Sequence, residues 1–98
     1  MVQVKVVEID KPHMQNLEVV GRVVEKTPSA NYNGKLYCKA TIEDDTGKVQ
    51  VNLWREQVNQ LQVGDQVRIP NAFSHRKGKS LQISTWSDIV VIGESCAL

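Results

Sequence analysis

Residues 44–54 read DDTGKVQVNLW, a segment that opens with four turn-forming residues and continues as an alternating strand. Because side chains alternate between the two faces of a strand, inward Val49, Val51 and Leu53 send every second residue to the opposite face. That face carries one cation, two amides and an indole, from Lys48, Gln50, Asn52 and Trp54. Trp54 then has two interpretations: it packs beneath a neighbouring loop, or it is an exposed contact residue.

The length of 98 residues predicts a single domain over residues 1–98. Hydrophobic residues at 41% and charged residues at 23% are typical of a soluble globular protein and argue against disorder. No apolar run approaches the roughly 20 residues that cross a bilayer, and the N-terminus lacks a secretory signal pattern. We therefore expect an intracellular protein with no membrane partner, cytoplasmic in a prokaryote and nuclear in a eukaryote.

The residues offer no catalytic or metal-binding pattern. Cys38 and Cys96 lie far apart without a Cys or His at metal-ligand spacing, so we expect no metal site and no cofactor. His13 and His75 have no Cys, Ser or carboxylate at a telling spacing, and the glycines form no phosphate-binding loop. The sequence therefore predicts no enzyme. Cys38 falls at an inward strand position and is expected to be a small buried residue.

Short runs rich in β-branched residues are separated by turn signals, and no segment keeps a helical period over three turns. Strands are expected at residues 17–25, 36–43, 48–54, 63–69 and 80–84, with a further apolar stretch at 89–92. Gly21 indicates a bend or bulge where another backbone comes close, and Pro70 interrupts the fourth strand because proline cannot donate to the ladder. Residues 27–34 are a predicted loop whose tightest point is Asn33-Gly34.

Residues 55–61 lack strand alternation and place Val58 and Leu61 three apart, which predicts a short helix of two turns. Five strands with one short helix between the third and the fourth is the order of the OB-fold, an all-β, five-stranded Greek-key barrel. An SH3-like barrel would supply five short strands as well, but it would lack this helix.

In an OB-fold, strands two and three and their flanking loops form the surface on which oligonucleotides lie. Here that surface mixes aromatic residues with cations and amides, from Tyr32, Lys35, Tyr37, Lys39, Thr41, Gln50, Asn52, Trp54, Arg76, Lys77 and Lys79. A base stacked on an aromatic ring gains roughly 1 to 3 kcal/mol whatever its identity, and nearby cations neutralise the phosphates. The pattern favours unpaired nucleic acid, although a net charge of only +1 and the frequency of basic runs in solvated turns leave the plainer interpretation open.

Short motifs follow one another along nearly the whole chain: DKPHM at 10–14, NL at 16–17, GRVVE at 21–25, DDTG at 44–47, VNLW at 51–54, GD at 64–65, VRI at 67–69, NAF at 71–73, KG at 77–78 and IGE at 92–94, with Cys96. In order and spacing they resemble the simple OB-fold single-stranded-DNA-binding proteins of archaea and eukaryotes, which are related to the OB modules of replication protein A. The resemblance implies stacking on Trp54 and Phe73. Where that family often has a further aromatic residue, this chain has Arg76-Lys77, which suggests more phosphate contact.

Strand parity alone does not decide whether the side chains of Phe73 and Trp86 are buried or exposed. A regular strand with Val67 and Ile69 inward would also bury Phe73, unless Pro70 marks a bulge that resets the register. Trp86 has outward parity, and we expect it to pack against the barrel, with binding as the alternative.

These observations predict binding of single-stranded DNA with little sequence preference; a place in DNA replication, recombination or repair is implied by the resemblance. The expected contacts are stacking on Trp54, Phe73 and Tyr37 and phosphate pairing, with binding residues Trp54, Phe73, Tyr37, Tyr32, Lys35, Lys39, Thr41, Gln50, Asn52, Arg55, His75, Arg76, Lys77 and Lys79. Single-stranded RNA is one alternative partner. The other is a protein partner in genome maintenance, because aromatic residues and arginine are also favoured at protein interfaces.

Overall fold

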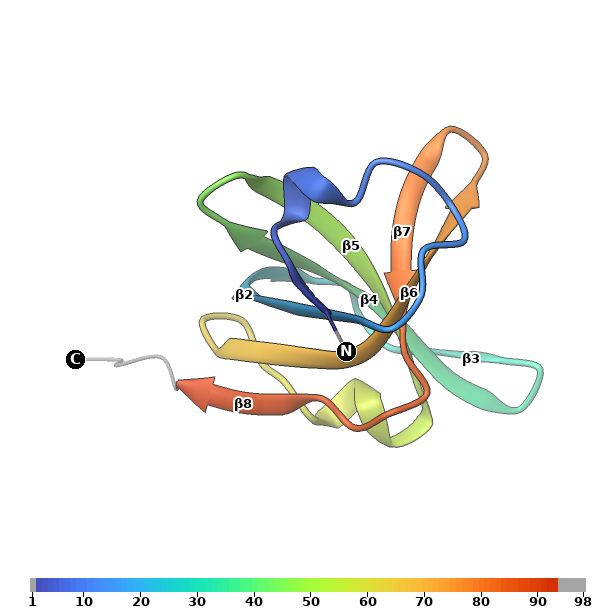
Figure 1. The fold of residues 1–98 in the computed structure, drawn as a ribbon. Helices are drawn as coiled ribbons and strands as arrows, with labels where there is room; N and C mark the ends of the chain where they lie inside the picture. The colour runs from blue at the N-terminus through green and yellow to red at the C-terminus, as the bar shows by residue number, and fades with distance from the viewer. Residues whose placement is uncertain (1, 94–98) are drawn as a thin grey trace.

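Five strands close into a barrel in the computed structural model, which describes residues 2–93 (Figure 1). They are β2 (Leu17–Lys26), β4 (Lys35–Asp44), β5 (Gly47–Trp54), β6 (Gln66–Lys77) and β7 (Ser80–Ser84). The strand order is β1-β2-β4-β5-β7-β6-β8, and an additional pairing of β2 with β6 closes the ring. The predicted all-β, five-stranded OB-fold barrel is thus confirmed.

Five shorter elements lie outside the five barrel strands: β1 (Val2–Val4), η1 (Val6–Glu8), β3 (Ala30–Tyr32), η2 (Arg55–Asn59) and β8 (Val90–Gly93). η2 lies between the third and fourth barrel strands, as predicted. It is a 3-10 helix of five residues, so the expectation of a two-turn helix reaching Leu61 was wrong. No helix among residues 2–93 has both the length and the apolar character needed to span a membrane.

The segment expected to be a loop, residues 27–34, contains β3, which pairs with the start of β4. Asn33 and Gly34 form its turn with φ angles of 51° and 77°, and positive φ at both positions is what a two-residue hairpin turn requires. The tight point was therefore predicted correctly, but the strand before it was missed. All three residues of β3 are exposed, so no apolar alternation marks it in the sequence.

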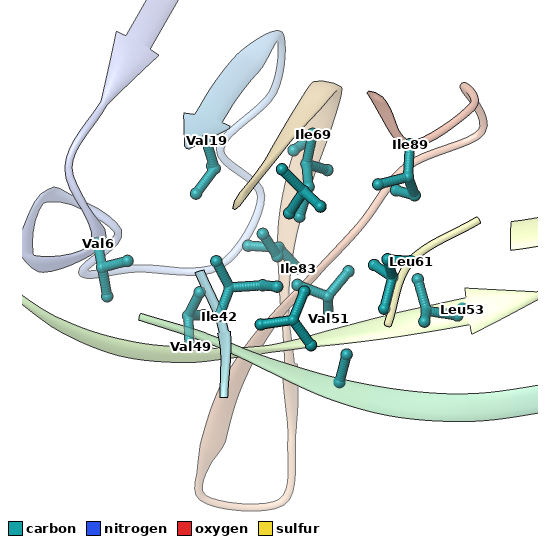
Figure 2. Close-up of a cluster of buried hydrophobic side chains, with 14 of the residues drawn as sticks. Val6, Val19, Ile42, Val49, Val51, Leu53, Leu61, Ile69, Ile83 and Ile89 are labelled. Atoms are coloured by element: carbon teal, nitrogen blue, oxygen red, sulfur yellow. The ribbon is translucent and has the colours of Figure 1, made fainter. Parts of the chain in front are cut away.

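The barrel interior is filled by the inward side chains of the alternating strands (Figure 2). Val49, Val51 and Leu53 of β5 are buried as predicted, and Cys38 in β4 is 1% exposed. Gly21 in β2 lies beside the end of β4, where Arg22 pairs with Glu43, and a Cβ placed there would sit 2.7 Å from the Glu43 carbonyl oxygen. The predicted close backbone approach at Gly21 is confirmed.

β6 continues as one strand past Pro70, so the expected interruption of the fourth strand was wrong. Its register with β2 changes from Val19↔Ile69 to Leu17↔Ala72. Two steps along β2 thus correspond to three along β6, which is a bulge with one extra residue. Proline is tolerated in a strand at such a bulge because a ladder position is skipped there.

The bulge reverses the parity of the second half of β6. Ala72 and Ser74 are buried, whereas Phe73 and His75 lie on the outer side and are half-buried. Asn71, within the bulge, has a φ of 53°. Phe73 is therefore not a core residue, and the alternative in which the bulge resets the register is the correct one.

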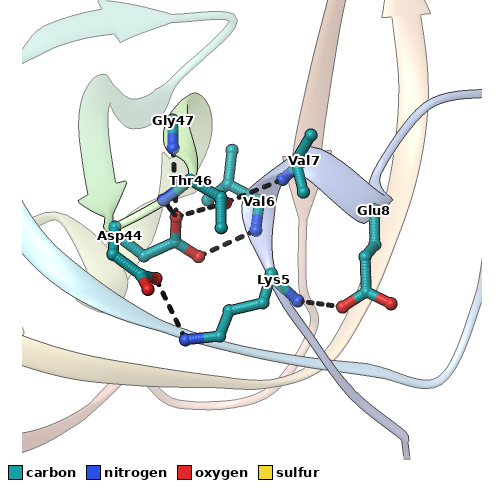
Figure 3. Close-up of polar contacts among 8 residues, drawn as sticks. Lys5, Val6, Val7, Glu8, Asp44, Thr46 and Gly47 are labelled. Atoms are coloured by element: carbon teal, nitrogen blue, oxygen red, sulfur yellow. Dashed lines mark hydrogen bonds and ion pairs between the residues drawn. The ribbon is translucent and has the colours of Figure 1, made fainter.

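The turn between β4 and β5 holds the N-terminal segment against the barrel (Figure 3). The Asp44 carboxylate accepts hydrogen bonds from Val6 N (2.8 Å), Thr46 N (2.7 Å), Thr46 Oγ1 (2.6 Å) and Gly47 N (3.2 Å). Burial opposes ionisation of this carboxyl, but the hydrogen bonds outweigh burial and lower the pKa of Asp44. Beside it, Lys5 forms an exposed ion pair with Asp45 at 3.0 Å.

Candidate nucleic-acid interface

Three aromatic rings meet at the end of β5. Tyr37 in β4 lies directly opposite Trp54 in β5, and their ring centroids are 4.3 Å apart with planes tilted by 42°. Tyr32 from β3 adds an edge contact to Trp54 at 6.2 Å. Trp54 is half-buried by these tyrosines and is open to solvent elsewhere, so it is not sealed beneath a loop.

A polar network lies next to these rings. The Tyr37 hydroxyl donates to Asn52 Oδ1 at 2.6 Å, and Asn52 Nδ2 donates to Gln82 Oε1 at 2.9 Å. Asn52 has the predicted outward parity but is only 5% exposed, which differs from the expectation of an open surface residue. Parity fixes the face of a side chain, but neighbouring side chains decide whether solvent reaches it.

His75 completes this network from β6. Asn52 Nδ2 lies 3.2 Å from His75 Nε2, which in turn lies 2.7 Å from Ser84 Oγ. An amide nitrogen can only donate, so this contact is a hydrogen bond in the neutral tautomer whose Nε2 carries no proton. Burial, with the charge of Lys77 as a second cause, lowers the pKa of His75 and favours the same neutral form.

A second aromatic group lies beyond the network. The Phe73 ring is 6.0 Å from the His75 ring and 5.9 Å from Trp86, whose plane is tilted from it by 31°. Trp86, in the connection from β7 to β8, is 88% exposed. The expectation that Trp86 packs against the barrel was therefore wrong.

The predicted phosphate-binding cations have no acidic partner within the structure. Lys35, Arg55, Arg76, Lys77 and Lys79 are exposed, and Lys39 is half-buried. Ion pairs among residues 2–93 join Lys5 to Asp45, Lys48 to Glu43 and Arg68 to Glu18, and none involves these six side chains. Because no carboxylate neutralises them, their charges are available to an anionic ligand.

Two grooves meet at Trp54. The central groove, about 290 Å³, takes Tyr32, Tyr37 and Trp54 from the β3–β5 side, His75 and Lys77 from β6, and Asn52, Gln82 and Ser84 between them. The tryptophan groove, about 560 Å³, is lined by Lys35, Trp54, Arg55, Glu56, Gln57, Thr85, Trp86 and Asp88. The structure thus gathers most of the predicted site around one indole.

Some predicted residues line neither groove: Lys39, Thr41, Gln50, Phe73, Arg76 and Lys79. Gln50 is nevertheless connected to the network, since Gln82 Nε2 donates to its Oε1 at 3.0 Å. Sequence reasoning missed Gln82 and Ser84, although their alternation with Leu81 and Ile83 in β7 places them on the outer face. Among residues 2–93, no cluster of three or more His, Cys, Asp or Glu side chains could hold a metal ion.

Known proteins share both this sequence pattern and this architecture. Single-stranded DNA binding protein Ssb from Saccharolobus solfataricus is 27% identical over 81 residues, covering 79% of this chain and 55% of the relative, so the chain spans about half of that protein. A domain of replication protein A from Methanococcus maripaludis is similar with a TM-score of 0.81 at 22% identity, over 95% of this chain and 98% of that one. The OB domain of Ta0387 from Thermoplasma acidophilum gives 0.73 at 25% identity, over 98% and 92%.

The tRNA_anti-codon family model, described as an OB-fold nucleic acid binding domain, matches residues 17–89. This match begins at the first residue of β2 and ends just before β8, so it contains the whole barrel and both grooves. The chain therefore belongs to the family of OB-fold nucleic acid binding domains.

Proposed function

We propose that this domain binds single-stranded DNA with little sequence preference, by stacking bases on Trp54, Phe73 and Tyr37. The observation that carries the proposal is the group of aromatic rings around Trp54, open to two grooves on the outer face of the barrel. A duplex hides its base faces within the stack, whereas a single strand can offer them to exposed rings. Each stacked base contributes roughly 1 to 3 kcal/mol.

Phosphate pairing supplies the second part of the affinity. Lys35, Lys39, Arg55, Arg76, Lys77 and Lys79 carry charge without an internal acidic partner. Cations that contact phosphates release condensed counterions, so binding weakens as salt concentration rises. A protein-interaction module with mainly apolar contacts would respond little to salt, which separates the two functions.

The polar network next to the rings supports the proposal of weak sequence preference. Asn52 contacts both Gln82 and His75 through its side-chain nitrogen, and no buried side-chain nitrogen or oxygen among residues 2–93 lacks a partner. Reading a base edge requires donors or acceptors that are free to meet it. Aromatic rings stack on any base, so this surface is suited to bind different base sequences rather than to recognise one of them.

DNA is proposed as the partner because the similar protein from Saccharolobus solfataricus is named a single-stranded DNA binding protein. We further propose a role inside the cell in DNA replication, recombination or repair, with other proteins of genome maintenance as partners.

Titration with oligo-dT tests the proposal through tryptophan emission at two salt concentrations. We expect quenching, a steep loss of affinity at higher salt, and a roughly 5- to 150-fold weaker affinity for Trp54→Ala. Val7→Ala, which removes an exposed apolar side chain from η1, is the control and should bind as the wild type does. Oligo-rU measured in parallel decides between DNA and RNA. Unchanged affinity in Trp54→Ala would reject the stacking site.

A further inference from the structure

Trp86 is an exposed indole that contributes little to the stability of the fold. It is 88% exposed, and its ring lies 5.9 Å from the Phe73 ring of the barrel, tilted by 31°. Aromatic side chains stabilise a protein through the large apolar area that they bury, and this one buries little of it. A tryptophan kept in water beside an aromatic surface is therefore suited to contact a ligand.

The backbone on both sides of Trp86 is held by hydrogen bonds. Nε2 of the buried Gln57 donates to the carbonyl oxygens of Thr85 (2.7 Å) and Ser87 (2.8 Å), the residues on either side of Trp86. The Thr85 hydroxyl donates to the Pro70 carbonyl and accepts from Ser87 N at 3.1 Å. A side chain presented on a fixed backbone loses less conformational entropy when a ligand binds.

The same glutamine connects Trp86 to the proposed site. Gln57 Oε1 accepts a hydrogen bond from the backbone N–H of Trp54, with an N···O distance of 3.1 Å. One buried amide thus holds the backbone at Trp54 and on both sides of Trp86, and the two indoles line the tryptophan groove together. Their relative position is set by the fold before any ligand arrives.

We propose that Trp86 is a further base-stacking residue, onto which a single strand bound at Trp54 continues through the tryptophan groove. The proposal rests on the proposed function of the domain. An indole carries no charge. Trp86 therefore adds stacking contact without phosphate neutralisation of its own, so its share of the affinity does not depend on salt.

Two single-tryptophan variants test the inference directly, because the chain contains only two tryptophans. In Trp54→Phe all tryptophan emission comes from Trp86, and in Trp86→Phe all of it comes from Trp54. Phenylalanine preserves a stacking ring in each variant, so binding continues. The ligand is an oligo-dT of about 12 nucleotides, within the roughly 4 to 16 nucleotides that one OB-fold covers.

We expect oligo-dT to quench emission in both variants. Quenching in Trp86→Phe without quenching in Trp54→Phe would overturn the inference and leave the proposed function standing. Absence of binding by either variant and by the wild type, measured by anisotropy of a labelled oligo-dT, would instead overturn the proposed function.

Affinity provides the second measurement. Trp86→Ala should weaken oligo-dT binding by about 5- to 150-fold while the slope of log affinity against log salt stays unchanged. Because the side chain is exposed, its removal should leave the melting temperature unchanged, and Val7→Ala again serves as the exposed apolar control. Equal affinities of Trp86→Ala and wild type would exclude Trp86 from the site.

Discussion

The Tyr37 hydroxyl donates a 2.6 Å hydrogen bond to Oδ1 of the buried Asn52 side chain, while the Tyr37 ring lies 4.3 Å from the ring of Trp54. Both ends of the tyrosine are thereby fixed, its oxygen by an amide and its ring by an indole. Asn52 is itself held through its nitrogen by Gln82. A residue that solvent scarcely reaches thus orients an aromatic surface at which ligands are proposed to stack.

Tyr37→Phe tests this anchor. The change keeps the ring and leaves the buried Asn52 oxygen without its donor, so the free energy of unfolding should fall by roughly 1 to 3 kcal/mol, as measured by urea denaturation. Tyr32→Phe is the matched control, because the Tyr32 side chain is exposed and its hydroxyl makes no hydrogen bond within residues 2–93. Equal effects of the two substitutions would show that the Tyr37 hydroxyl has no special role.

Two arginines of β6 separate a phosphate contact from a structural ion pair. Arg76 is exposed without an acidic partner, whereas Arg68 lies 3.5 Å from Glu18. Arg76→Ala should reduce the slope of log affinity against log salt by roughly 0.7, the value for one phosphate contact on a single strand. Arg68→Ala should leave the slope unchanged. Oligo-dT titrations over a series of salt concentrations measure both, and identical slopes for the two variants would contradict the assignment of Arg76.

Two glycines differ in the space around them. A Cβ at Gly21 would lie 2.5 Å from Ile42 Cγ2 and 2.7 Å from the Glu43 carbonyl oxygen, whereas one at Gly47 would meet only Val6 Cγ1 at 3.6 Å. Gly21→Ala should therefore lower the free energy of unfolding by about 1 to 3 kcal/mol through overpacking. Gly47→Ala should change it by less than about 0.5 kcal/mol. Thermal or urea denaturation measures both, and a tolerated alanine at position 21 would mean that the barrel wall can move.

The Asp44 carboxylate makes stability depend on pH. Its hydrogen bonds outweigh burial and lower its pKa below the ordinary value of 3.8, so its contribution is present above that pH and is lost as the pH falls through the lowered pKa. Asp44→Asn replaces one of the two accepting oxygens by an amino group, which cannot accept the hydrogen bond that Val6 N donates to Oδ2, so it should cost roughly 0.5 to 1.5 kcal/mol at pH 7. The difference from wild type should shrink below about pH 3.8, which urea denaturation from pH 7 to pH 3 measures.

Asp45→Asn is the control for this pH dependence, because Asp45 takes part only in an exposed ion pair with Lys5. Such pairs contribute little to stability. A loss in Asp45→Asn as large as that in Asp44→Asn would assign the effect to surface charge rather than to the hydrogen bonds that hold η1.

Strand alternation, turn signals and the position of one short helix predicted the barrel, and alternation predicted which side chains of β5 face outward in the candidate site. Val49, Val51 and Leu53 point inward, and Trp54 points outward, because β5 is a regular strand whose inner side chains are all apolar. The hairpin turn at Asn33-Gly34 could also be predicted from the sequence, because asparagine and glycine are the residue types that most readily adopt positive φ. Local chemistry determined these features without reference to the rest of the chain.

Other features depend on contacts that distant residues make. Asn52 is buried because Tyr37, Gln82 and His75 converge on it from three other strands. Trp86 lies in a connection where no strand period applies, so parity could not place it. β3 has no apolar face at all, and its pairing with β4 becomes apparent only from the fold.

The extra residue in β6 decides which side chains the second half of the strand presents to a ligand. If the bulge were flattened at the present chain length, regular alternation would turn Phe73 into the barrel and bring Ala72 and Ser74 to the outside. Deletion of one residue between Ile69 and Ala72 would instead remove the bulge and keep Phe73 on the outer face. A comparison of related domains should therefore allow a gap of one residue at this point, because a strand without the bulge can present an aromatic side chain on the same face.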